Sequence, residues 1–135
     1  MPKNWSIDST DQYLEWFDTK LDEAEQNAVV AAVEKLQEFG PALRRPLVGN
    51  IDGSAFPNMK ELIPPRGSIR ILFAFDPERT AFLLVGGDKT DQWVTWYEKN
   101  VPLADRLYQR HLDDLSARKN DQESQVDRKG KRRAR

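Results

Sequence analysis

The stretch that decides the fold is residues 69–87, which read IRILFAFDPERTAFLLVGG. In its first seven residues the side chains alternate between two faces, as they do in a β-strand. One face carries Ile69, Ile71, Phe73 and Phe75, and the other carries Arg70, Leu72 and Ala74. Residues 76–79, DPER, have proline where type I turns favour it, and the apolar run 81–87 predicts a second strand in the middle of a sheet.

A third strand is predicted at residues 59–63, and PPRG at 64–67 is typical of the turn that follows it. Neighbouring strands joined by short turns pair antiparallel, so the three strands predict a meander. Residues 41–57, rich in Pro, Gly, Asn and Asp, predict a long loop before it.

Two helices are predicted before the loop. Asp8, Ser9 and Thr10 are candidate N-caps for the first helix, which has apolar residues at helical spacing from Tyr13 to Leu21. The second begins near Asp22, where Glu25 completes a capping box, and Gly40-Pro41 ends it. Upstream, Trp5 and Ile7 alternate with polar neighbours, which fits either a short strand or an extended arm.

A last helix is predicted from Asp91, its N-cap candidate, with a kink at Pro102. Helical spacing of apolar residues continues to Leu115, after which the chain is polar and basic. We therefore expect one α+β domain at 1–117, with two N-terminal helices packed on a small antiparallel sheet and a C-terminal helix. Residues 118–135 are expected to form a disordered tail.

Composition excludes several kinds of chemistry. The 135 residues include no cysteine and one histidine, His111, which rules out disulfides, thiolate nucleophiles, histidine zinc clusters and a two-histidine ribonuclease mechanism. No apolar run is long enough for a membrane span, and residues 1–5 lack the apolar part of a secretory signal. A cytoplasmic location without membrane partners is expected.

Charge is segregated along the chain although the net charge is only −1. Residues 8–38 have a balance of −7, residues 40–75 of +3 and residues 119–135 of +4. Either these regions serve different partners, or the pattern is only a solvated surface.

Candidate catalytic residues are Lys60, Arg70, Lys89 and Tyr97; candidate RNA-binding residues are Arg66, Asp88 and Trp96. Cations of this kind stabilise the charge of a phosphodiester transition state, lysine or tyrosine can move protons, and aromatic rings can stack on bases. Whether Lys60 and Arg70 share a face depends on strand register, which the sequence leaves open. The alternative is that the lysines are solvated charges and the aromatic residues belong to the core.

Three stretches, read together, carry a family resemblance. They are PNMKEL at 57–62, RILFAFDP at 70–77, and LVGGDKT at 84–90 with WY at 96–97 and ADRLY at 104–108. Their order and spacing resemble the phage-derived branch of HigB-like toxins in the RelE/ParE superfamily, over roughly residues 10–115. The resemblance implies a RelE-like fold.

The resemblance also implies a cytoplasmic toxin of a type II toxin–antitoxin system, neutralised by a cognate antitoxin that often has a helix-turn-helix domain. HigB and RelE toxins cleave mRNA in the ribosomal A site without metal or cofactor, by attack of the ribose 2′-hydroxyl. By position, Lys60, Arg70 and Lys89 match the basic residues of the family's cleft, and Tyr97 lies in the closing helix.

Two features depart from the family pattern. Many relatives are basic, whereas residues 1–118 have a balance of −5, and the candidate site lacks the histidine that some relatives use. Two alternatives therefore stay open: a gyrase-inhibiting toxin of the ParE kind, and an inactive module that only binds the antitoxin.

Overall fold

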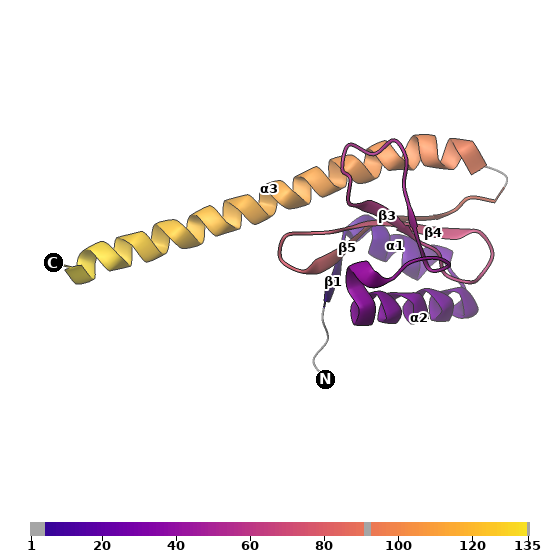
Figure 1. Ribbon diagram of the computed structural model, residues 1–135, viewed down its shortest axis with the longest axis horizontal. Coiled ribbons are helices and arrows are strands. Elements are labelled where there is room, and N and C mark those ends of the chain that lie inside the picture. Colours follow the sequence, from indigo (N-terminus) through magenta and orange to yellow (C-terminus); the bar gives the residue numbers. More distant parts are fainter. Residues whose placement is uncertain (1–4, 91–92, 135) are drawn as a thin grey trace.

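A computed structural model describes residues 5–90 and 93–134, so the predicted N-cap Asp91 lies outside the described residues. Three α-helices, a short 3-10 helix and one five-stranded sheet form the molecule (Figure 1). In chain order they are β1 Ser6–Ser9, α1 Asp11–Lys20, α2 Glu23–Phe39, η1 Gly40–Ala42, β2 Val48–Asn50, β3 Met59–Leu62, β4 Ile69–Phe75, β5 Thr80–Asp88 and α3 Trp93–Ala134.

The predicted meander is confirmed, because β3, β4 and β5 pair antiparallel in sequence order. The sheet order is β1-β5-β4-β3-β2, so β5 has a neighbour on each side, as its apolar run predicts. Two strands extend the sheet at its edges. The residues around Ile7 form β1, which pairs parallel with β5, and part of the predicted loop 41–57 forms β2, which pairs antiparallel with β3.

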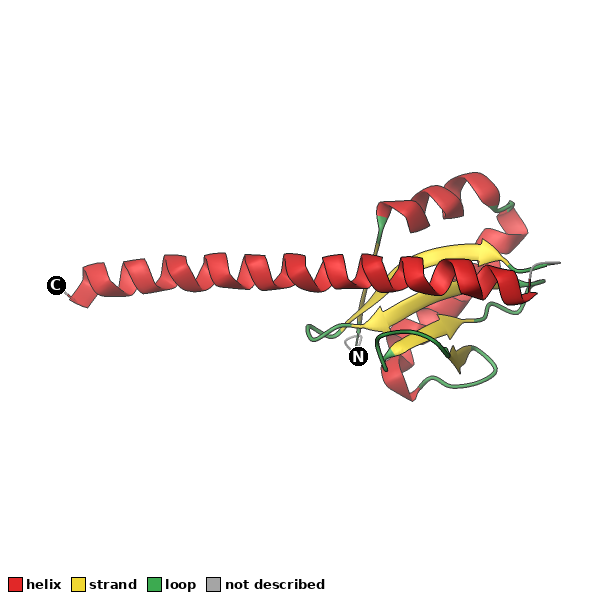
Figure 2. Cartoon of the chain, turned by 90° about the horizontal axis from the view of Figure 1, so that it is seen from above, coloured by secondary structure: helices red, strands yellow, loops and turns green. Residues whose placement is uncertain are grey.

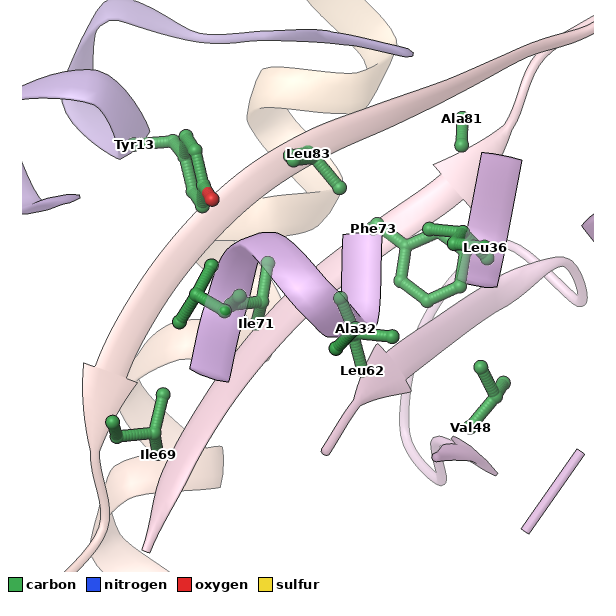
Figure 3. Packing of buried hydrophobic residues seen from close by; sticks show 11 residues of the cluster. Tyr13, Ala32, Leu36, Val48, Leu62, Ile69, Ile71, Phe73, Ala81 and Leu83 are labelled. Atoms are coloured by element: carbon green, nitrogen blue, oxygen red, sulfur yellow. The ribbon is translucent and has the colours of Figure 1, made fainter. Parts of the chain in front are cut away.

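The sheet separates two hydrophobic cores. The first core holds Ile69, Ile71 and Phe73 of β4 against α1 and α2, and Figure 3 shows these side chains beside those of Tyr13, Ala32 and Leu36. The second core holds Leu72 and Ala74 of the same strand against α3. The alternation predicted for 69–75 is therefore confirmed, and both faces of β4 are buried because helices cover both.

Both N-terminal helices begin at the residues that the sequence indicates. The Thr10 side chain accepts a hydrogen bond from the Tyr13 amide at 3.0 Å. Asp22 and Glu25 form the complete capping box. α2 ends at Gly40, whose φ of 54° is easily reached by glycine.

A glycine pair near the end of β5 lets two tryptophans approach the sheet from opposite sides. A methyl group on Gly86 would lie 2.2 Å from the Trp16 ring, and one on Gly87 would lie 2.4 Å from Nε1 of Trp96. Side chains larger than hydrogen do not fit at either position, so this glycine pair fixes how α1 and α3 pack on β5.

Four polar contacts from three residues of α3 hold this helix on the sheet and its loops. Asp105 accepts hydrogen bonds from the Ser54 hydroxyl and the Ala55 amide, Tyr108 donates to the carbonyl of Phe75, and His111 lies 2.8 Å from Asp76. Residues 105, 108 and 111 follow one another at a spacing of three, so they lie along the same side of the helix.

α3 is one continuous helix that contains Pro102, so the two parts of the predicted last helix belong to a single element. The backbone of the predicted disordered tail, 118–135, is helical up to Ala134, and the helix projects well beyond the domain in both Figure 1 and Figure 2. Once the packed part has nucleated the helix, each further residue adds a hydrogen bond, and Ala117, Arg118 and Lys119 are good helix formers. Low hydrophobicity predicts disorder for this segment, whereas helix propensity and continuity with the packed part of α3 favour a helix.

Removing residues 119–135 should leave the domain as stable as before, because the described side chains from Ser116 to Gln122 are all exposed. We expect the thermal midpoint to change by less than about 2 °C, since surface changes away from packed features cost within about 0.5 kcal/mol. Circular dichroism should show a loss of helical signal on truncation. A large fall in the thermal midpoint would contradict the view that residues 119–135 contribute nothing to the packing of the domain.

In the part of the chain that the structure describes, every helix is too short or too polar to cross a bilayer.

Candidate active site

A cleft of ≈ 720 Å³ lies between the first turns of α3, the loop after β2, and strands β3 and β4. Three of the four predicted catalytic residues line it: Arg70 from β4, Lys89 from the end of β5, and Tyr97 from α3. The other charged lining residues are Arg45, Asp52, Glu61 and Glu98.

Glu61 connects the groups in the cleft. Its side chain is buried, with the residue 7% exposed, and its Oε1 accepts a hydrogen bond of 2.6 Å from the Tyr97 hydroxyl. The same oxygen lies 3.6 Å from Nε of Arg70. The register explains this arrangement: Glu61 is opposite Leu72, two residues from Arg70 on the same face of the sheet.

Tyr97 is held in its protonated form. Burial raises its pKa to about 12, and the hydrogen bond to Glu61 and that carboxylate's charge act in the same direction, with Arg70 partly opposing them. At neutral pH the hydroxyl is therefore a hydrogen-bond donor. It fixes the carboxylate of Glu61 in the cleft.

Arg70 has hydrogen-bonding capacity left over. Nη1 donates to the carbonyl of Ile69 at 2.8 Å, while the buried Nε has no hydrogen-bond partner. A buried N–H without an acceptor costs free energy. Arg70 is thus held by one hydrogen bond and by charge attraction to Glu61. A buried donor left without an acceptor is more typical of a binding site than of a packed core.

Lys89 lies opposite Tyr97, with Nζ 5.7 Å from the centre of the tyrosine ring. Its amide donates to the carbonyl of Ser68, which fixes the end of β5 beside the start of β4. Burial lowers the pKa of Lys89, the positive charge of Arg70 lowers it further, and Glu61 opposes both. A lysine with a lowered pKa exchanges its proton more readily near neutral pH than a solvated one.

Replacing Glu61 by glutamine should lower the pKa of Lys89 further. The carboxylate favours the ammonium form, so its removal weakens that form and moves the titration to lower pH. The ¹³Cε resonance of Lys89, followed by NMR from pH 7 upward, measures the change directly. Glu98→Gln, in the same cleft lining, should leave the titration in place. A Lys89 pKa that rises in the Glu61→Gln protein would contradict this electrostatic account.

Lys60 does not join the other three predicted residues. The register pairs it with Phe73, whose ring lies in the first core, so Lys60 points to the face of the sheet that α2 covers. Its Nζ donates to Oδ1 of Asn50 at 2.9 Å, and it lines a second cleft. Lys60 and Arg70 therefore lie on opposite faces of the sheet.

The three candidate RNA-binding residues also lie in different settings. Trp96 is 6% exposed and packs on Gly87 in the second core, so its ring is not available to stack on a base. Asp88 is exposed at the end of β5 and accepts a hydrogen bond from the Thr90 amide. Arg66 is exposed in the turn between β3 and β4, outside the cleft lining.

Sequence reasoning missed Glu61 and Arg45. Glu61 is a charged residue inside a predicted strand, where its position after Lys60 left the buried face undecided. Arg45 lies in the predicted loop, and only the formation of β2 brings it to the cleft. The available signal for Glu61 was its alternation with Met59 and Ile63, two apolar residues on the same face of the predicted strand.

His111 serves the fold rather than this cleft. Its Nε2 lies 2.8 Å from Oδ2 of Asp76, and its ring stacks on Phe82 with centroids 3.7 Å apart. Neither it nor Asp76 lines the cleft. Within residues 5–90 and 93–134, no three histidine or acidic side chains gather as metal ligands would.

The sequence matches that of known proteins over most of this domain. The family described as phage-derived protein Gp49-like matches residues 15–109. The HigB3 protein of Mycobacterium tuberculosis is 48% identical over 101 residues, which cover 75% of this chain and 88% of HigB3. The chain belongs to the Gp49-like, HigB family of toxins. HigB2 of the same organism is 46% identical to this HigB-family chain over 95 residues, covering 68% of it and 47% of HigB2.

Solved structures place this HigB-family chain in the RelE fold. The isolated RelE toxin of E. coli superposes with a TM-score of 0.52 at 13% identity, covering 62% of this chain and 83% of RelE. The toxin–antitoxin complex RelBE of E. coli gives 0.50 at 10% identity, covering 62% of this chain and 95% of the matched chain. At identities this low, the superpositions support the α+β RelE-like fold alone, and the chemistry has to be inferred from the residues of the site.

Proposed function

We propose that this protein is the toxin of a type II toxin–antitoxin pair and a ribosome-dependent endoribonuclease that cleaves mRNA without metal. The observation that carries the proposal is the grouping of Arg70 and Lys89 with Glu61 and Tyr97 in one cleft. Membership of the HigB family supports the same activity. The partners are then a cognate antitoxin, mRNA and the ribosomal A site.

The reaction is an internal transfer of the phosphoryl group. The ribose 2′-oxygen forms a bond to phosphorus, the bond from phosphorus to the 5′-oxygen breaks, and the upstream product ends in a 2′,3′-cyclic phosphate. One proton leaves the 2′-hydroxyl and one is delivered to the 5′-oxygen, so no outside reactant is consumed. The enzyme must position the RNA, stabilise the added charge on the phosphoryl oxygens and transfer these protons.

The residues of the cleft divide these tasks. Arg70 offers its guanidinium to the phosphoryl oxygens, where a fixed cation stabilises developing charge. Lys89, whose pKa is lowered, transfers a proton. Glu61 and Tyr97 hold the two cations in position through their mutual hydrogen bond.

The test is a short pulse of expression in growing bacteria, followed by mapping of mRNA 5′ ends. New ends inside translated frames within minutes of induction are expected, and co-expression of the antitoxin should remove them. Intact mRNA with arrested growth and DNA damage would overturn the proposal in favour of a gyrase inhibitor. Intact mRNA with normal growth would overturn it in favour of a module that only binds the antitoxin.

A further inference from the structure

A second cleft, of ≈ 490 Å³, opens on the other side of the edge strand β2. Its lining includes three cationic side chains, Arg44, Arg45 and Lys60, and no carboxylate. The remaining lining is apolar or neutral: Pro41, Leu43, Val48, Gly49 and Asn50. A concave site with three positive charges and no negative one suits an anion.

The three cations of this second cleft form no ion pair among the described residues, and Glu61, which lies near Arg45, lines the first cleft and not the second. Lys60 donates to the neutral amide oxygen of Asn50, and both arginines are exposed. Among the described residues, none of the three has a carboxylate oxygen within 4.0 Å. In a chain with more acidic than basic residues, three such cations in one concave site provide a local positive potential.

The two clefts share part of their lining at the edge of the sheet. Arg45 and Asn50 line both of them. Gly49, between these residues, lies against both side chains: a methyl group there would lie 3.1 Å from Nη2 of Arg45 and 3.3 Å from Oε2 of Glu61. The Arg45 guanidinium therefore lies against the backbone of β2, beside the carboxylate of the first cleft.

We propose that the second cleft binds a backbone phosphate of the RNA strand whose neighbouring phosphodiester lies in the first cleft. Lys60 and Arg44 hold this phosphate, and Arg45 lies where the strand turns around β2. Lys60 is accordingly a substrate-binding residue and not a catalytic one. This inference rests on the proposed ribonuclease function for the identity of the strand, while its binding test does not require cleavage.

The binding test uses the full-length protein and a fluorescent twelve-nucleotide RNA with 2′-O-methyl groups, which keep the phosphates and remove the nucleophile. Fluorescence anisotropy measures the dissociation constant at several salt concentrations. Lys60→Ala and Arg44→Ala should each weaken binding about five- to tenfold at low salt. Each should also reduce the salt slope by about 0.7, the value for one lost contact to a single strand. Lys20→Ala, an exposed lysine at the end of α1, is the matched control.

The kinetic test separates binding from chemistry on programmed ribosomes. Lys60→Ala should raise KM and leave kcat within about threefold of the wild-type value, because it removes an interaction made equally in the ground and transition states. Unchanged affinity and salt slope in both variants would overturn the inference, as would a Lys60→Ala kcat reduced as far as that of Arg70→Ala. If the variants bind as expected and the wild type cleaves nothing, the phosphate site stands and the proposed function fails.

Discussion

Replacement of Arg70 by alanine is expected to reduce the single-turnover rate of mRNA cleavage by about 100- to 1,000-fold, the usual loss when a fixed donor to a developing charge is removed. The side chain lies in the cleft beside Glu61, and its guanidinium provides a fixed positive charge there. Lys89 is assigned to proton transfer in this mechanism and does not duplicate that fixed charge.

The lower cleavage rate of the Arg70→Ala protein should come from the chemical step and not from a loss of folded protein. Arg70 makes one hydrogen bond, to the neighbouring carbonyl of Ile69, and its Nε lies 3.6 Å from Oε1 of Glu61. Circular dichroism should match that of the wild type, and the thermal midpoint should fall by only a few degrees, because Glu61 loses its cation but keeps the hydrogen bond from Tyr97. Arg110→Ala, which removes an exposed arginine of α3, is the control and should cleave at the wild-type rate. Full activity in the Arg70→Ala protein would remove this residue from the mechanism.

The largest expected effect on stability is that of Asp76→Ala, at about 3 kcal/mol. The Asp76 side chain is 2% exposed. Its Oδ1 accepts hydrogen bonds from the amides of Glu78 and Thr80 at 2.8 and 2.9 Å, and its Oδ2 lies 2.8 Å from His111. Alanine would leave two turn amides and a buried imidazole without their partner, and unmade bonds of this kind cost about 1–3 kcal/mol each, partly relieved by water.

Thermal unfolding measures this effect, with an expected fall of about 10 °C in the midpoint for a domain of this size. Asp113→Ala, which removes an exposed aspartate two residues beyond His111, should change the midpoint by no more than about 2 °C. An Asp76→Ala protein as stable as this control would contradict the view that the pair anchors α3 to the turn between β4 and β5.

Local patterns in the sequence predicted the elements that depend on neighbouring residues. The alternation at 69–75, the capping box of Asp22 and Glu25, and the stop at Gly40 are set by period and backbone chemistry, and all three are present. The order of helices, meander and closing helix follows from them. The strand β1 was predicted only as one of two alternatives, a short strand or an extended arm, because it depends on pairing with the distant β5. The strand β2 was not predicted, because it has only three residues and lies within a stretch that reads as a loop.

Part of the candidate site could also be predicted, because residue type and position along a strand or helix are local properties of the sequence. Arg70, Lys89 and Tyr97 were identified from residue type and position, and the structure brings them together. The face of Lys60 depends on the register between β3 and β4, and a shift of one residue would exchange it with Glu61. Trp96 is an aromatic residue of the kind that can stack on bases, but the absence of a side chain at Gly87 lets its ring pack into the core.

The central claim is that the cleft cleaves RNA by attack of the 2′-hydroxyl, and the chemistry of the new RNA ends tests it most directly. Purified protein is mixed with ribosomes programmed with a defined mRNA, and the 3′ end of the upstream fragment is identified by mass spectrometry. The account predicts a 2′,3′-cyclic phosphate, and no cleavage when the nucleotide at the cut carries a 2′-O-methyl group. A 3′-hydroxyl end, or cleavage that persists in the 2′-O-methyl RNA, would contradict it.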